Sequence, residues 1–282
     1  DVYKKRLASA DWLAQETRDK AIVKLNTITP HIGYPEKLPE TYTKKIIDES
    51  LSLVENAQNL AKISIAHSWS KWNKPVDRSE WHMPAHMVNA YYDPQQNQIV
   101  FPAAILQAPF YSLEQSSSAN YGGIGAVIAH EISHAFDTNG ASFDENGSLN
   151  NWWQEADYKA FTERTDKIVE QFDGLDSYGA KVNGKLTVSE NVADLGGVAC
   201  ALEAAKQDDD FSARDFFINF ATIWRMKARP EYMQMLASID VHAPGKLRTN
   251  VTLTNFDDFH EEFDVKASDP MWRAPEDRVI IW

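Results

Sequence analysis

Apolar residues recur at intervals of three and four along most of this chain, the spacing that places them on one face of an α-helix. Stretches with this spacing predict helices over residues 12–25, 39–61, 154–172, 212–228 and 256–263. In the second stretch the predicted core positions are Ile46, Ile47, Leu51, Leu53 and Val54. Proline and glycine in Thr29-Pro30 and Gly33-Tyr34-Pro35 predict a loop between the first two helices.

The period changes to two between residues 86 and 103. Residues 88–92 and 98–101 are rich in β-branched and aromatic side chains, and turn-forming residues 93–97 separate them. This pattern predicts a β-hairpin. The residues alone leave two interpretations open: the hairpin only packs against the core, or its exposed edge pairs with an extended peptide.

Two more amphipathic helices are predicted around residues 124–135 and 188–202. Glycines at 122, 123 and 125 loosen the entry to the first, and Asn139-Gly140 marks its exit. The second contains Gly196-Gly197, although each glycine costs a helix roughly 1 kcal/mol relative to alanine. We interpret this glycine pair as a point where another backbone comes close.

The first of these helices carries an HExxH motif, formed by His130, Glu131 and His134. Imidazoles four residues apart share one helix face, where both can reach one metal ion. A hydrolytic zinc site takes three protein ligands and keeps one position open, and two histidines with a glutamate are a known set. Glu190 on the second helix is the predicted third ligand, and Glu131 is close enough to the open position to act on a bound water.

Two aspartates follow the predicted ligands at helical spacing. Asp137 comes three residues after His134, and Asp194 comes four after Glu190. A metal-bound imidazole usually donates its other N–H to a carboxylate, which fixes the tautomer. Both aspartates are therefore candidates for orienting a histidine, and the alternative is a solvated charge on a helix.

The turn from Asp240 to Arg248 holds two further candidates. Peptide hydrolysis generates an oxyanion, to which a histidine such as His242 can donate a hydrogen bond. An arginine such as Arg248 can hold a carbonyl or carboxylate with two parallel hydrogen bonds. The competing interpretation is an ordinary surface turn.

Composition narrows the classes of function. Hydrophobic residues make up 43% and charged residues 24%, and no apolar run approaches the ~20 residues that span a bilayer, so no membrane segment is expected. The formal charge of -13 argues against nucleic acid as a partner. The first residues lack the pattern of a signal peptide, and a single cysteine, Cys200, is typical of a reducing compartment. A cytoplasmic location is therefore expected.

Taken together, the motifs resemble the C-terminal part of the neprilysin family (M13) of zinc metallopeptidases. The likeness runs essentially end to end. The stretches that carry it are residues 88–92 (VNAYY), 97–102 (NQIVFP), 120–125 (NYGGIG), 130–137 (HEISHAFD), 190–194 (ENVAD), 229–232 (RPEY) and 242–245 (HAPG), with Arg248. The resemblance implies a mostly helical α+β fold, with a thermolysin-like zinc metallopeptidase core and a small β-sheet.

The resemblance also implies a role for each matching residue. One Zn²⁺ per chain would be bound by His130, His134 and Glu190. The other implied roles are general base for Glu131, histidine-orienting carboxylates for Asp194 and Asp137, substrate-backbone partners for Asn89 and Ala90, transition-state stabiliser for His242 and substrate-carbonyl partner for Arg248. This overturns the interpretation of the hairpin as a packing element only.

Members of that family are much longer and have a helical N-terminal domain that covers the catalytic chamber. We therefore expect residues 1–75 to be a helical remnant of that domain, or a bridge to it, and residues 76–282 to be the catalytic domain. Because the cysteine pattern of animal members is absent, a bacterial oligopeptidase is the nearer comparison.

The predicted function is a zinc-dependent endopeptidase that hydrolyses short oligopeptides through a zinc-activated water, with Glu131 as the general base. The alternative is a zinc-stabilised, peptide-binding fragment that is inactive without its N-terminal domain.

Overall fold

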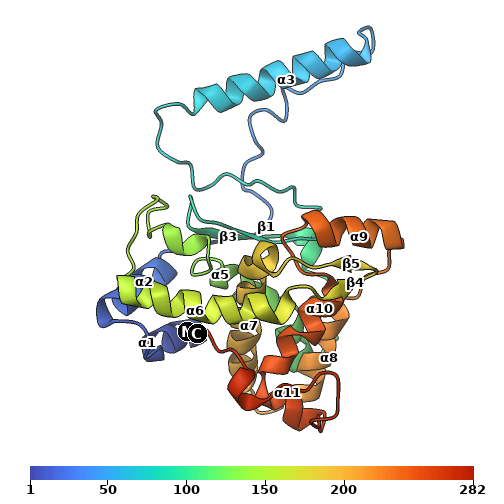
Figure 1. Cartoon of the computed structure of the whole chain (residues 1–282). Helices are drawn as coiled ribbons and strands as arrows, with labels where there is room; N and C mark the ends of the chain where they lie inside the picture. Colours follow the sequence, from blue (N-terminus) through green and yellow to red (C-terminus); the bar gives the residue numbers. More distant parts are fainter.

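Two crossing helices, α5 (Ala126–Ser133) and α7 (Gly184–Ala205), lie at the centre of the computed structural model, which describes residues 1–282 (Figure 1). A short helix α4 (Ser117–Asn120) and a π-helical turn η2 (Tyr121–Gly125) lead into α5. The glycine-rich entry predicted from the sequence is therefore a continuous helical lead rather than a loop.

The helices α5 and α7 approach one another closely at the glycine pair. A Cβ at Gly197 would lie 2.8 Å from the Ala126 carbonyl oxygen and 2.9 Å from the His130 nitrogen. At Gly196 it would lie 2.5 Å from the Ser133 hydroxyl oxygen. These contacts confirm the interpretation of Gly196-Gly197 as a close backbone approach.

The remaining helices pack around this pair. They are α6 (Glu155–Phe172), α8 (Ala213–Ile223), α9 (Pro230–Ile239), α10 (Gly245–Asn250) and α11 (Asp257–Glu262), with 3₁₀ turns η1 (Ala103–Ile105), η3 (Gly140–Ser142), η4 (Thr252–Asn255) and η5 (Pro275–Asp277). The prediction of α6 and α11 is confirmed. The predicted helix 212–228 ends five residues early, at Ile223, and a separate helix begins at Pro230, since proline fits the first turn of a helix. None of the helices combines the length and apolarity needed to cross a membrane.

A three-stranded sheet lies at one end of this helical body. The strands are β1 (Thr29–Gly33), β2 (Tyr91–Asp93) and β3 (Gln98–Pro102), in the order β1-β3-β2. The predicted hairpin is confirmed by the antiparallel pairing of β2 with β3. A second, two-stranded antiparallel sheet is formed by β4 (Asp176–Ser177) and β5 (Ala180–Lys181).

The predicted loop at residues 29–35 is wrong, because β1 pairs in parallel with β3 there. Pro30 is compatible with this pairing since β1 is an edge strand, where a missing N–H can face away from the sheet. The partner strand lies some seventy positions further along the chain, so local pattern did not reveal the pairing.

The N-terminal helices α1 (Val2–Ser9) and α2 (Gln15–Asn26) belong to the same core as the central helices. Tyr3 and Leu7 of α1 are buried, and Tyr3 stacks on Phe136, just beyond α5. On α2 the buried positions are Thr17, Ala21 and Lys24. Residues 1–33 therefore pack with the central helical body.

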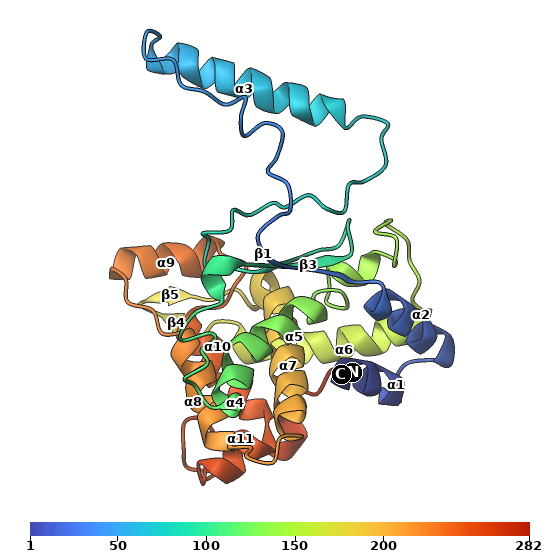
Figure 2. The same ribbon diagram turned by 180° about the vertical axis from the view of Figure 1, so that it is seen from behind.

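The chain leaves this body after Gly33 and carries helix α3 (Leu53–Ser70), which stands apart from it in both views (Figures 1 and 2). It returns at Arg78, whose carbonyl oxygen lies 3.0 Å from His31 Nε2 on β1. The predicted helix 39–61 is wrong in its first half: helix begins only after Ser52, which forms a capping box with Glu55. The predicted core positions are also wrong, since Leu51 is half-buried and the others, Ile46, Ile47, Leu53 and Val54, are 60% or more exposed. Nothing in this chain covers the four exposed side chains.

Replacing Gly197 by alanine tests the contact between α5 and α7. Helix propensity alone would raise the free energy of unfolding by roughly 1 kcal/mol. The added methyl group would displace the backbone of α5, at a cost of about 1–3 kcal/mol. We therefore expect a lower midpoint in urea unfolding, and a higher midpoint would contradict the close approach.

Candidate metal centre

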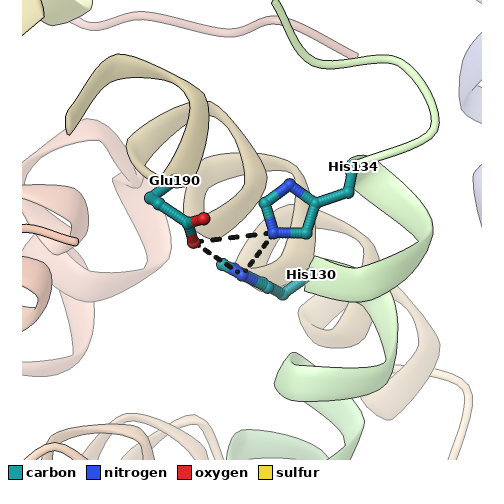
Figure 3. A group of neighbouring side chains, drawn as sticks. All are labelled: His130, His134 and Glu190. Atoms are coloured by element: carbon teal, nitrogen blue, oxygen red, sulfur yellow. Dashed lines mark hydrogen bonds and ion pairs between the residues drawn. The ribbon is translucent and has the colours of Figure 1, made fainter. Parts of the chain in front are cut away.

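The side chains of His130, His134 and Glu190 converge on one point between α5 and α7 (Figure 3). The two histidines lie one turn apart near the end of α5, and their Nε2 atoms are 3.0 Å apart. The Glu190 Oε2 atom, from the facing side of α7, lies 3.3 Å from His130 Nε2 and 3.5 Å from His134 Nε2. The predicted trio is thus brought together.

The hydrogen bonds on the far side of each ring show what this trio can bind. His130 Nδ1 lies 2.8 Å from Asp194, and His134 Nδ1 lies 2.6 Å from Asp137. An ionised carboxylate only accepts, so each Nδ1 carries the proton and each Nε2 keeps its lone pair. Glu190 Oε2 is buried and accepts no hydrogen bond. Three lone-pair donors facing one another fit a cation, and this donor set with an open fourth position fits Zn²⁺.

Asp137 is held rigidly behind His134. Its Oδ1 atom accepts hydrogen bonds from the backbone N–H groups of Asn139 (2.8 Å) and Gly140 (2.7 Å). Its Oδ2 atom accepts one from the Ser189 hydroxyl (2.5 Å) in addition to the one from His134. With four donors, the carboxylate has little freedom, and the orientation of the His134 ring follows from it.

Asp194 is held behind His130 by a buried arginine. Arg248 donates from Nε to Asp194 Oδ2 (2.8 Å) and from a terminal nitrogen to Oδ1 (2.6 Å). Burial alone would raise the pKa of Asp194, but the charge of Arg248 and the hydrogen bonds from His130 and Arg248 lower that pKa to about 2. The guanidinium also lies 3.7 Å from the centre of the Trp224 ring.

Glu131 is 5% exposed and points into the same cavity as the metal-binding trio. Burial raises the pKa of its carboxyl above the ordinary value, and the nearby His130 and His134 oppose this shift. A buried carboxylate with a raised pKa is a better proton acceptor than one in water.

A cavity of about 440 Å³ collects nearly all the predicted site residues. Those lining it are Asn89, Ala90, His130, Glu131, His134, Asp137, Glu190, His242 and Arg248, while Asp194 lies behind His130. Asn89 and Ala90 continue the edge strand beyond its paired part, which begins at Tyr91. His242 Nε2 lies 3.2 Å from Glu190 Oε2, and its Nδ1 lies 2.8 Å from Asp240.

Three residues of the site escaped sequence reasoning. Ser189 fixes Asp137, Trp224 stacks on Arg248, and Asp240 holds the His242 ring. Ser189 and Asp240 lie within two positions of predicted residues, so a search for polar neighbours would have found them. Trp224 follows directly after α8, and no local pattern pointed to it as a site residue.

Replacing Asp194 by asparagine is expected to weaken Zn²⁺ binding by 10–100-fold, because His130 loses its orienting carboxylate. The same change leaves the Arg248 charge buried without a counterion, so the free energy of unfolding should fall by about 3–5 kcal/mol. Competition with a chromogenic chelator and urea unfolding measure the two effects. Asp209→Asn, at an exposed position, is the control, and unchanged zinc affinity in Asp194→Asn would contradict the orienting role.

Comparison with known proteins identifies the relatives of this chain. The model of peptidase family M13 matches residues 89–279, and a second model of that family matches residues 1–35. The neutral endopeptidase of Lactococcus lactis subsp. lactis is 58% identical over 281 residues, which cover 100% of this chain and 45% of the relative.

Solved structures agree with the sequence matches. PepO from Lactobacillus rhamnosis has a TM-score of 0.93 at 44% identity, and the zinc metalloprotease ZMP1 of Mycobacterium tuberculosis, in complex with an inhibitor, has 0.93 at 38%. Each match covers 100% of this chain and 45% of the other, so the chain spans less than half the length of these relatives. The predicted fold class, zinc metallopeptidase class and metal cofactor are confirmed by these matches and the converging donors. The chain belongs to peptidase family M13.

Proposed function

We propose that this chain forms the catalytic part of a zinc-dependent endopeptidase that hydrolyses peptide bonds in short oligopeptides. The observation that supports this most strongly is the convergence of His130, His134 and Glu190 in one cavity with Glu131. Three ligands leave a coordination position open, which is the arrangement of catalytic rather than structural zinc.

Bound Zn²⁺ would lower the pKa of a water and polarise the scissile carbonyl group. Glu131 is then the general base: its buried carboxylate takes a proton from the attacking water and passes it to the leaving amine. Asp194 and Asp137 keep the proton of each histidine on Nδ1, so that both Nε2 lone pairs stay directed at the metal position.

The other lining residues bind the substrate in this proposal. The backbone of Asn89 and Ala90 continues an edge strand, which suits pairing with an extended peptide. His242 must be doubly protonated to donate to the oxyanion from Nε2, because its Nδ1 proton is held by Asp240. This form is favoured: burial alone would lower the pKa of His242, but the hydrogen bond and charge of Glu190 raise it above the ordinary value. Arg248 lines the cavity and holds a substrate carbonyl, although two of its nitrogens already bind Asp194.

We further propose that the segment 34–88 is the bridge to the N-terminal part of the longer protein, and that this part restricts access to short peptides. The support is the apolar surface of α3, on which Leu53, Val54 and Trp69 are 64–85% exposed. This proposed bridge is shorter than the one expected over residues 1–75, because residues 1–33 contribute to the core of the body. The bacterial relatives and the single buried Cys200 support a cytoplasmic location.

A second candidate function follows from the length of the chain relative to its relatives. A zinc-stabilised fragment that binds peptides without cleaving them would have the same donors and the same edge strand. It differs from the enzyme only in turnover.

Replacing Glu131 by glutamine should leave Zn²⁺ bound and lower turnover of a quenched fluorescent peptide by about 10²–10⁴-fold, because the amide cannot accept the proton. Glu163→Gln, at an exposed position of α6, is the matched control and should keep full activity. A chelator should abolish cleavage by the parent chain. Unchanged turnover in Glu131→Gln would remove it as the base, and zinc-loaded parent chain that binds peptide without cutting it would select the second candidate.

Replacing Val54 and Trp69 together by aspartate tests the bridge. Neither side chain packs on the body, so the urea midpoint of this chain should not change. In the full-length protein both would lie at an interface, and its free energy of unfolding should fall by about 2 kcal/mol or more. Asn59→Asp, exposed on the same helix, is the control, and equal midpoints for full-length parent and variant would contradict the bridge.

A further inference from the structure

Lys24 of α2 is a buried cation far from the metal ligands in sequence. Its side chain is among the largest fully buried ones, and the residue is 1% exposed. Its Nζ donates three hydrogen bonds to backbone carbonyl oxygens: Ala135 (2.6 Å), Gly140 (2.7 Å) and Phe143 (2.7 Å). Each of the three ammonium hydrogens of Lys24 therefore has a hydrogen-bond acceptor.

The three carbonyl groups belong to the segment that follows the metal-binding helix. Ala135 is the residue after His134, the C-cap of α5, so its carbonyl lies just beyond the C-terminal end of that helix. A cation is favourable there, because the C-terminal end of a helix carries partial negative charge. Gly140 and Phe143 lie beyond Asp137, so Lys24 binds this segment on both sides of that carboxylate.

The backbone of Lys24 is hydrogen-bonded to the hairpin formed by β2 and β3. Asn97, at the turn between β2 and β3, donates from Nδ2 to the Lys24 carbonyl (3.2 Å) and to the Thr27 hydroxyl (3.0 Å). The Tyr92 hydroxyl on β2 in turn donates to Asn97 Oδ1 (2.9 Å). One residue therefore connects the edge-strand hairpin with the segment that carries Asp137.

Burying a lysine at this position is unfavourable for its charged form. Burial lowers the pKa of Lys24 to about 7, against the opposing charges of Asp137, Asp144 and Glu145. No carboxylate forms an ion pair with it, and its Nζ lies about 6 Å from the centres of the Tyr92, Phe136 and Trp152 rings. Three acceptors can be satisfied together only by the ammonium form, since a neutral amine has two hydrogens.

We propose that Lys24 is a positioning residue for the metal centre, which fixes residues 135–143 so that Asp137 stays against His134. This inference rests on the proposed metal site, but not on peptide cleavage. The path is short: Lys24 holds the Gly140 carbonyl, the Gly140 N–H donates to Asp137, and Asp137 accepts from His134. Freeing the segment would let the carboxylate turn and the His134 lone pair leave the metal.

The test measures Zn²⁺ affinity and the visible spectrum of the Co²⁺-loaded chain for Lys24→Met, which has similar length but no hydrogen to donate. We expect affinity to fall roughly tenfold, and the Co²⁺ spectrum to shift in the direction seen for Asp137→Asn. Lys20→Met, exposed on the same helix, should change neither. Because no peptide is present, the result is independent of whether the chain is an active enzyme.

A double-mutant cycle shows whether Lys24 acts through Asp137. Residues in one network are not additive, so Lys24→Met should reduce affinity much less in the Asp137→Asn background than in the parent. Full additivity, or a lower unfolding midpoint with unchanged zinc affinity and an unchanged Co²⁺ spectrum, would overturn the proposal and leave Lys24 as a structural residue.

A measurement on the parent chain covers the case in which Lys24→Met does not fold. If the contacts of Lys24 favour metal binding, then metal binding must strengthen those contacts by the same factor. Acetylation by acetic anhydride, followed by mass spectrometry, should therefore be slower at Lys24 with Zn²⁺ than without it, and equal at Lys20. The same rate at Lys24 in both samples would overturn the proposal.

Discussion

The close contact between α5 and α7 is the constraint on which the rest of the molecule depends. HExxH supplies two ligands from a single helix, but the third must come from elsewhere, at a distance of a few ångströms. Gly197 lets the backbone of α7 lie against Ala126 and His130, and Glu190 two turns earlier then faces both imidazoles. A side chain at the glycine would widen the gap between ligands that belong to different helices.

Around this contact, the buried charges are arranged so that negative groups outnumber positive ones at the metal position. Asp194 has Arg248 as a partner and Asp137 has hydrogen-bond donors, but the Glu190 Oε2 atom has no hydrogen bond at all. An unpaired buried carboxylate oxygen is unfavourable in the absence of a cation. A bound cation would relieve this unfavourable state of Glu190, which favours metal binding. Metal binding and the stability of the fold are therefore linked.

The sequence predicted the site better than it predicted the surrounding elements, and the reason is physical. His130, Glu131 and His134 are related by helix geometry alone, which a short motif specifies. Strand β1 depends on pairing with β3, and the helix that begins at Leu53 depends on its cap rather than on periodicity. Lys24 and Trp224 reach the site only through tertiary packing, so no local pattern distinguished them from other core residues.

The segment that carries α3 is attached to the sheet at both ends, since it leaves after Gly33 of β1 and returns at Arg78, whose carbonyl lies beside His31 of the same strand. Any surface that α3 meets within the same polypeptide is therefore met at a high effective concentration, set by the tether rather than by diffusion. A contact too weak to form between separate molecules can then be permanently occupied. The returning residues are held to the body before they reach Asn89, by hydrogen bonds from Gln98 to the Glu80 carbonyl and from the Ala104 N–H to the Ala85 carbonyl. The tether can therefore place α3 while the edge strand keeps its alignment.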